Sequence, residues 1–380
     1  MTKLIFTLLI SAAMAACKFA NAAPYEPIDD NTILATSVAK NFSGPRPNKL
    51  ISADAADQLA RQYLRQTQLT GDARFVGYAQ AALQNWLNDA NNIQPHLLVT
   101  VALIKQHLHD FSGAVKDLDR AIALVPDDMQ ARLTRASLLQ LRGDFDAARE
   151  DCRSLLGMNV LVAYTCLAGS ARSDTEVTRV YDVLTRLLQQ TSTAEENIVQ
   201  WSLQALAILA ERRGEYKLAL QSLAQAKAIG PADITLSALY CDALLKQGKA
   251  SEALSQLDSD NLAEPLLLRK ILTLQALELD ASASIKQLQD RFDAEKTRDD
   301  QRHLREEAIY ELRVLKRSDV ALALARRNWL QQKEPIDTQL LLEAAQFSGS
   351  KQDIALIRNW IKEQNYYDAD VVAQLAREGV

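Results

Sequence analysis

Histidine is the side chain best suited to acid–base catalysis and metal binding near neutral pH. This chain of 380 residues contains four of them. His96, His107 and His109 lie close together, whereas His303 stands far away in the sequence. None belongs to an H-E-x-x-H pair, the helical spacing that holds zinc in metalloproteases. The chain also has no G-x-S-x-G turn, phosphate-binding glycine loop or G-x-G-x-x-G sequence. We therefore expect a protein that is not an enzyme.

His96 and His107 could still contribute to a metal or haem site. No cysteine or acidic cluster accompanies them on the same predicted helix, and such ligands usually complete a site. A solvated polar surface explains the two histidines more simply. We therefore expect neither a metal nor a cofactor, and we keep a cofactor-carrying role as an alternative.

The composition favours helices over strands. Only 12 glycines and 9 prolines occur in the chain, which leaves few tight turns and disfavours a β-sandwich or barrel. The hydrophobic fraction of 48% is ample for a core, and 4 cysteines are too few for a small disulfide-stapled domain. The net charge of −5 gives no electrostatic reason to expect nucleic acid as a partner.

The prolines and glycines mark an internal repeat. Pro231 and Pro265 are 34 residues apart, and four segments of that length align with one another: 95–128, 129–162, 200–233 and 234–267. Small residues recur at the eighth and twentieth positions, namely Ala102, Ala136, Ala207 and Cys241, and Ala114, Ala148, Ala219 and Ala253. A period of this size is typical of a solenoid of helix pairs. The small residues would let the two helices of a pair approach closely.

A turn residue recurs at the fifteenth position, an aromatic residue follows two positions later in three units, and proline closes three units: His109, Gly143, Gly214 and Gly248; Phe111, Phe145 and Tyr216; Pro126, Pro231 and Pro265. Together with the small residues, this pattern resembles the tetratricopeptide repeat (TPR) family. The resemblance implies an all-α fold, a right-handed α-solenoid of stacked antiparallel helix pairs. Residues 51–380 would then form one solenoid of about nine pairs, with a helix that caps its C-terminal end. The resemblance also implies that the concave groove of the solenoid binds a protein or peptide partner.

In the TPR family, certain positions on the first helix of each pair face the concave groove. In this chain those positions are held by His96, Leu103, His107, Gln130, Ser137, Trp201, Gln204, Ile208 and Arg212. An exposed tryptophan in a groove is a good anchor for a partner. Trp201 could equally pack on the preceding pair, and the sequence leaves both alternatives open.

Two cysteines are candidates for a disulfide. Cys152 falls on the second helix of one predicted unit and Cys166 on the first helix of the next, at equal distances from residue 159. Residues placed in this way lie opposite each other in an antiparallel pair. A bond would form if their Cα atoms come within about 7 Å. The alternative is that both are separate small core residues, which is the role we expect for Cys241.

The first 22 residues have the features of a secretory signal peptide. Lys3 precedes an uncharged apolar run over residues 4–16, and the A-N-A sequence at 20–22 matches an A-x-A cleavage site. The mature chain would begin at Ala23 with an extended, proline-rich linker over residues 23–50. No later segment is long and apolar enough to span a membrane.

A lipid anchor is the alternative for this amino terminus. The M-A-A-C sequence that ends at Cys17 resembles the lipobox of bacterial lipoproteins, in which the cysteine is acylated. Cys17 would then attach the protein to the outer membrane. Without the lipid, we expect the protein to be periplasmic or secreted.

These patterns together predict an exported protein–protein interaction scaffold in a bacterial cell envelope. Its partner would be a protein or peptide bound in the groove. Two alternatives remain: an accessory subunit that delivers a metal or haem to an envelope enzyme, and an assembly factor anchored to the outer membrane as a lipoprotein.

Overall fold

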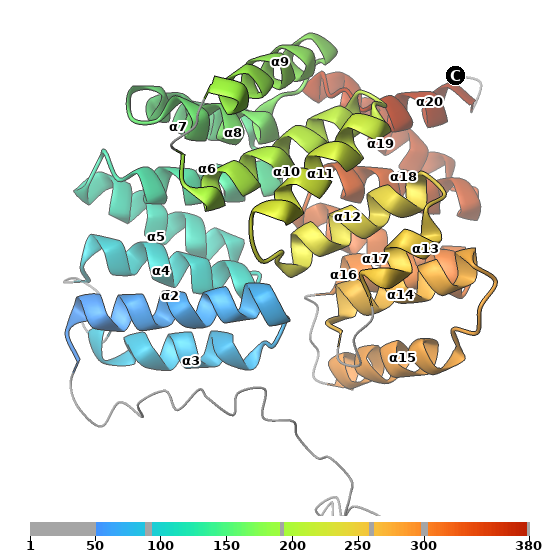
Figure 1. Cartoon of the computed structure of the whole chain (residues 1–380), viewed down its shortest axis with the longest axis horizontal. Helices are drawn as coiled ribbons and strands as arrows, with labels where there is room; N and C mark the ends of the chain where they lie inside the picture. The colour runs from blue at the N-terminus through green and yellow to red at the C-terminus, as the bar shows by residue number, and fades with distance from the viewer. Residues whose placement is uncertain (1–50, 88–92, 191–193, 258–261, 298–302, 378–380) are drawn as a thin grey trace, which may run out of the picture. The chain divides into compact units, whose positions relative to one another are not determined.

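Helix pairs follow one another along the described part of the chain (Figure 1). The computed structural model describes residues 51–87, 93–190, 194–257, 262–297 and 303–377, all within a unit that spans Ile51–Val380. Within these ranges every regular element is helical and no strand occurs, which confirms the predicted all-α class. The predicted signal peptide with Cys17 and the predicted linker lie outside the described residues.

Each pair consists of two helices joined by a short turn, and nine pairs occur in the described ranges. The first helices are α2 (Ala53–Thr70), α4 (Pro95–His107), α6 (Met129–Arg142), α8 (Val160–Ser170), α10 (Glu196–Arg212), α12 (Ile234–Lys246), α14 (Glu264–Ala276), α16 (Leu304–Ile309) and α18 (Pro335–Ser348). The second helices are α3 (Arg74–Leu83), α5 (Phe111–Leu124), α7 (Phe145–Ser154), α9 (Asp174–Gln190), α11 (Tyr216–Ile229), α13 (Ala250–Ser255), α15 (Ser282–Thr297), α17 (Ser318–Gln331) and α19 (Lys351–Gln364). Helix α20 (Ala369–Arg377) follows the last pair. Short 3₁₀ turns extend α3 (Gln84–Trp86) and α7 (Leu155–Gly157), and a π-helical turn extends α16 (Tyr310–Val314).

The small residues of the repeat explain how the pairs pack. The alanines at the twentieth position are completely buried, and those at the eighth position are at most 1% exposed. Cys241 takes the eighth position of its unit and is also completely buried, as predicted for a small core residue. Side chains of this size leave room for the neighbouring backbone, so the two helices of a pair and the next pair pack closely. The core therefore runs along the array and is not gathered at one centre.

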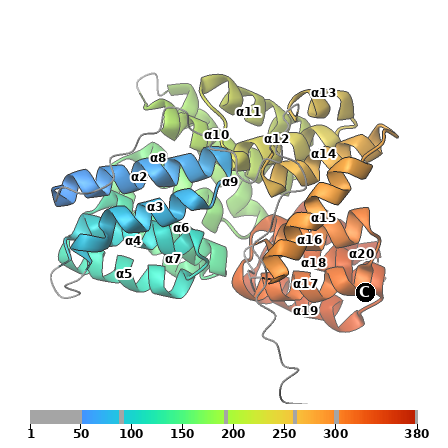
Figure 2. The same cartoon turned by 90° about the horizontal axis from the view of Figure 1, so that it is seen from below.

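The last pairs pack back against the earlier ones. Lys333, between α17 and α18, donates its backbone N–H to the carbonyl of Leu141 at the end of α6, at 2.7 Å. Phe145 of α7 belongs to a hydrophobic cluster whose other members all lie between Cys241 and Val371. Figure 2 shows α16–α20 returning beside α6 and α7. The array is thus held together by contacts between pairs that are far apart in the sequence.

A second long-range contact involves the turn of the first pair. Helix α2 packs against α12, and the turn after α2 contains Gly71 with φ 73°. A Cβ atom at this position would lie 2.5 Å from the Cβ of Ala263 and 2.8 Å from the Cδ1 of Ile234. A side chain at position 71 would collide with the side chains of Ala263 and Ile234, so glycine is required there for its size as well as for its backbone angle.

Gly71→Ala should therefore destabilise the fold more than Gly248→Ala. Gly248 has a similar φ of 70° but no atom within 4 Å of its missing Cβ, so its replacement costs only the left-handed backbone strain of about 1 kcal/mol. Gly71→Ala adds an overpacked contact worth about 1–2 kcal/mol. Urea unfolding of both variants measures the difference. Equal losses in the free energy of unfolding would show that Ala263 and Ile234 accommodate a Cβ atom at position 71 without cost.

Candidate partner-binding surface

The predicted groove positions of α4 are partly covered. His96 is half-buried, with its Nε2 atom 3.3 Å from an oxygen of Asp54 on α2. Leu103 is also half-buried and packs against the core of the first pair. His107 lies at the end of α4, where burial lowers its pKa, so its imidazole is neutral at neutral pH. These three side chains present a mixed apolar and polar surface that is only partly open to solvent.

The two predicted groove residues of α6 are exposed. Gln130 donates from its side-chain amide to Thr134 Oγ1 at 3.1 Å, one turn along the same helix. Ser137 donates its hydroxyl hydrogen to the carbonyl of Leu133 at 3.0 Å. Both hydrogen bonds are local, and the bond of Ser137 is exposed, so its hydroxyl can exchange this partner for a ligand. Of the nine predicted groove residues, these two are the most open to solvent.

The predicted groove residues of α10 are less accessible. Trp201, Gln204 and Ile208 are all half-buried. Trp201 packs against the hydrophobic cluster that contains the disulfide cysteines, as does Leu133 of α6. The structure thus favours the alternative in which Trp201 packs on a neighbouring pair, and its ring is only partly available to a partner.

Arg212 departs from the prediction, because the protein's own C-terminal segment covers it. Only 3% of this residue is exposed. Its guanidinium donates to the carbonyls of Ala171 at 2.7 Å, of Arg172 at 3.2 Å and of Tyr367 at 3.0 and 2.8 Å. It also lies over the ring of Tyr366, 4.4 Å from the ring centre. Arg212 therefore binds residues of its own chain and cannot contact a partner in this conformation.

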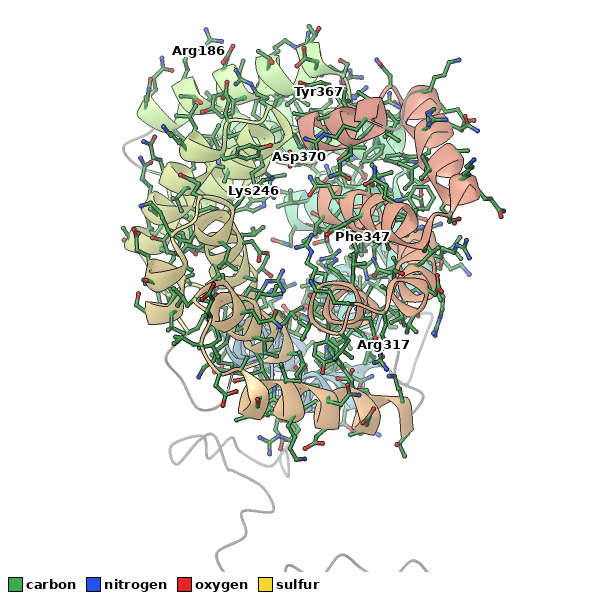
Figure 3. All side chains as sticks on the ribbon, turned by 90° about the vertical axis from the view of Figure 1, so that its right-hand side faces the viewer. Arg186, Lys246, Arg317, Phe347, Tyr367 and Asp370 are labelled. Carbon is green, nitrogen blue, oxygen red and sulfur yellow. A yellow bond between two sulfur atoms is a disulfide. The ribbon has the colours of Figure 1, made fainter. Side chains whose placement is uncertain are left out.

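Two more side chains, at the start of α11 and at the end of α12, also contact the C-terminal part of the chain. Lys246 at the end of α12 lies 2.5 Å from a carboxylate oxygen of Asp370 in α20. The hydroxyl of Tyr216 donates to the other oxygen of the same carboxylate, and the Lys246 ammonium lies 4.0 Å from the Tyr216 ring centre. Figure 3 shows Lys246 and Asp370 side by side, with Tyr367 nearby. We call Arg172, Arg212, Tyr216 and Lys246 the docking site, and residues 366–377 the C-terminal segment.

The sequence analysis did not predict Tyr216, Lys246 or Asp370 as site residues; it assigned Tyr216 only to the aromatic position of the repeat. Lys246 occupies the thirteenth position of its 34-residue unit, as Arg212 does in the unit before it. The repeat alignment could therefore have predicted Lys246 as a further groove residue. Asp370 carries no local signal, because its partners lie 124 and 154 positions away in the sequence. A contact of that range depends on how the pairs stack, which a periodic pattern does not specify.

An acidic side chain next to the docking site makes it sensitive to pH. The pKa of Glu211 is raised to about 7, chiefly because the side chain is buried. Lys246 lowers this pKa, and the neighbouring carboxylates of Asp242, Asp368 and Asp370 raise it. Glu211 is therefore partly protonated at neutral pH, and its ionisation adds a negative charge beside Asp370.

Glu211 should make the wild-type protein less stable as the pH rises. The pKa of Glu211 is higher in the folded state than the usual value of 4.5, so its contribution is complete below that value and is lost as the pH rises through about 7. Between pH 5 and pH 8, we expect the wild type to lose about 2 kcal/mol relative to Glu211→Gln, which does not ionise. Urea unfolding of both proteins across this range measures the effect. A difference between them that stays constant with pH would contradict it.

The two candidate cysteines form a disulfide in the structure. Cys152 on α7 and Cys166 on α8 are joined through their sulfur atoms, with their Cα atoms 5.4 Å apart. Both cysteines are buried in one hydrophobic cluster with Ala136 and Ala148, which are the small residues at the eighth and twentieth positions of the unit formed by α6 and α7. Cys241 remains a free thiol, and burial raises its pKa to about 11. An inert thiol of this kind fits a packing role.

His107, His109 and His303 line one cavity of about 380 Å³. The turn of the first pair, the starts of α12 and α14 and the loop before α18 meet at this cavity. His303 Nδ1 lies 2.7 Å from Glu295; burial lowers the pKa of His303, but this hydrogen bond and nearby carboxylates raise it to about 9. In the described ranges, no group of three or more His, Cys, Asp or Glu side chains is arranged to hold a metal ion. No helix in those ranges has the length and apolar character needed to cross a membrane.

No protein-family model matches the chain, and the search of curated proteins finds no match. Among solved structures, the chain is similar to a thermophilic TPR protein of Thermus thermophilus, with 19% identity, coverage of 49% of this chain and 100% of that chain, and a TM-score of 0.40. It is also similar to the Cut9–Hcn1 hetero-tetramer of APC/C, with 14% identity, 82% and 63% coverage and a TM-score of 0.49. A third similar structure is a tetratricopeptide repeat protein from Parabacteroides merdae, with 14% identity, 76% and 99% coverage and a TM-score of 0.37. The first and third of these belong to the repeat family that the sequence pattern resembles.

Proposed function

We propose that the protein is an exported, non-catalytic scaffold that binds a partner protein or peptide on the concave positions of α4 and α6. One observation carries this proposal. Gln130 and Ser137, at the second and ninth positions of their unit, are exposed, whereas Arg212, a predicted groove residue of a later pair, is covered by the C-terminal segment. A partner that approaches the concave positions therefore meets the early pairs first. Leu103 beside them adds partly exposed apolar surface to their hydrogen-bonding groups.

The disulfide supports export to the cell envelope. Disulfides persist in oxidising compartments such as the bacterial periplasm and are rare in the reducing cytosol. The bond between Cys152 and Cys166 is therefore what an exported protein would contain. Together with the signal-peptide features of residues 1–22, it supports a periplasmic or secreted location. Lipidation at Cys17 would place the same scaffold on the outer membrane.

A photo-crosslinking amino acid at position 137 should capture the partner in intact cells. The matched control carries the same amino acid at position 217, because Lys217 is also exposed but lies on the second helix of its pair. We expect a discrete crosslinked product with the group at position 137 and none at 217. The charge-introducing variant Leu103→Glu should reduce the yield at 137, since it places a carboxylate in the proposed surface. Equal products from both positions would overturn the assignment of the surface to α4 and α6.

A further inference from the structure

The docking site recognises main-chain atoms and two side chains of the segment that it holds. The backbone N–H of Tyr367 donates to the carbonyl of Arg172 at 2.8 Å, and the Tyr367 carbonyl accepts two hydrogen bonds from Arg212. These three hydrogen bonds involve only the backbone of residue 367. Any residue other than proline could make them, because proline alone lacks the N–H group. This part of the site therefore holds a peptide without selecting its side chain.

The residue before this backbone contact is selected for an aromatic ring. The ring of Tyr366 is 5% exposed and lies under the guanidinium of Arg212. On its other sides it meets the ring of Phe145 on α7 at 6.1 Å and the ring of Trp360 on α19 at 5.0 Å. Arginine and aromatic rings together attract an aromatic side chain through stacking and cation–π contacts. An aliphatic residue would fill the space but lose both of these contacts.

The residue four positions after the aromatic ring is selected for a carboxylate. Asp370 lies between the ammonium of Lys246 and the hydroxyl of Tyr216, and both donate to it. A charge-assisted hydrogen bond of this kind is stronger than a neutral one, and a basic residue here would be repelled by Lys246. The site as a whole therefore selects a segment with an aromatic residue and, four residues later, a carboxylate in the first turn of a helix.

The C-terminal segment is anchored mainly at its start. Tyr366 and Asp368 are 5% and 1% exposed, whereas in helix α20, which has nine residues, only the side chain of Val371 is buried. The ion pair between Lys246 and Asp370 selects for a carboxylate but contributes little to holding the segment, since its two side chains are 35% and 26% exposed. Terminal segments with few buried contacts open locally more readily than internal helices. When this segment opens, the docking site becomes free for another peptide of the same chemistry.

We propose that the docking site is an exchangeable binding site for a segment of a partner protein that carries an aromatic residue and, four residues later, a carboxylate. Residues 366–370 of the chain itself occupy the site in the closed conformation, and the partner segment replaces them. This surface is separate from the concave positions of α4 and α6 and does not depend on the function proposed for them. A partner segment must compete with the chain's own segment for the docking site. This competition lowers the apparent affinity of the partner.

The test uses a fluorescent synthetic peptide of residues 366–377 and the full-length chain. Asp370→Lys in the chain should expel the chain's own segment, because it places a second positive charge beside Lys246 and leaves the docking site intact. We expect the peptide to bind this variant at least about tenfold more tightly than it binds the wild type. Tyr216→Phe in the Asp370→Lys chain should weaken that binding, because it removes the hydroxyl that donates to the carboxylate of the peptide. The double variant Lys246→Glu, Asp370→Lys restores an ion pair of reversed sign, so its own segment should return. Even a peptide that carries Asp370→Lys, which the reversed charge would attract, should then bind this double variant weakly.

Three results would overturn the proposal. The first is equal affinity of the peptide for the wild type and for Asp370→Lys. The second is equally tight binding of a peptide that itself carries Asp370→Lys. The third is a concentration-dependent dimer of the wild type that Asp370→Lys abolishes, since a second copy would then be the natural occupant. If Asp370→Lys lowers the helicity of the chain, the same affinity comparison is made with Asp370→Asn, which removes the charge without reversing it.

Discussion

Arg212→Ala is expected to lower the free energy of unfolding by about 3–5 kcal/mol. The guanidinium is 3% exposed and donates to three different carbonyls, so its removal leaves buried carbonyl groups without a donor. It also removes the cation from the face of the Tyr366 ring. Because these partners lie on the turn after α8 and on the C-terminal segment, this segment should come away from α10 and from the turn after α8. Chemical unfolding followed by circular dichroism measures the loss.

Two matched variants make this expectation specific. Arg186→Ala removes an exposed arginine of α9 and should change the stability by less than about 0.5 kcal/mol. Arg212→Lys keeps the charge but lacks the planar fork that reaches several carbonyls at once, so it should recover only part of the loss. If Arg212→Ala were as stable as Arg186→Ala, Arg212 would be free for a partner, as the repeat pattern alone predicted.

Reduction of the disulfide is expected to lower the free energy of unfolding by about 3 kcal/mol. Cys152 and Cys166 are 14 residues apart, and a bond across a loop of that size mainly restricts the unfolded chain. The double variant Cys152→Ala, Cys166→Ala should be less stable than the oxidised wild type and should not respond to a reductant. Unfolding in urea with and without reductant measures both differences.

Thiol counting checks the same bond without a variant. If residues 1–22 are cleaved as predicted, three cysteines remain, and the unreduced, denatured mature protein should show one free thiol, Cys241. Denaturant is required because Cys241 is completely buried and its pKa is raised to about 11. A count of three thiols in protein trapped directly from cells would contradict both the disulfide and the oxidising compartment that supports the proposed export.

The sequence by itself determined the helix pairs and how neighbouring pairs pack. Small residues at the eighth and twentieth positions are needed wherever two helices of a pair touch, and helices of regular length make those positions recur every 34 residues. Ala102 and Ala114 show this: both are completely buried in the structure. These contacts join residues within one pair or between successive pairs, so a pattern of period and residue size is sufficient to predict them.

Only the tertiary structure decided which concave positions are open and which are covered. Arg212 and Tyr367 are 155 residues apart, and their contact depends on the small rotation between successive pairs summed along the array. No single repeat encodes that sum, so the repeat pattern assigns both Ser137 and Arg212 to the groove, although one is exposed and the other is buried. The local pattern predicts which side chains of a pair face the groove. The accumulated rotation between pairs determines whether the C-terminal segment covers one of these side chains, as it covers Arg212.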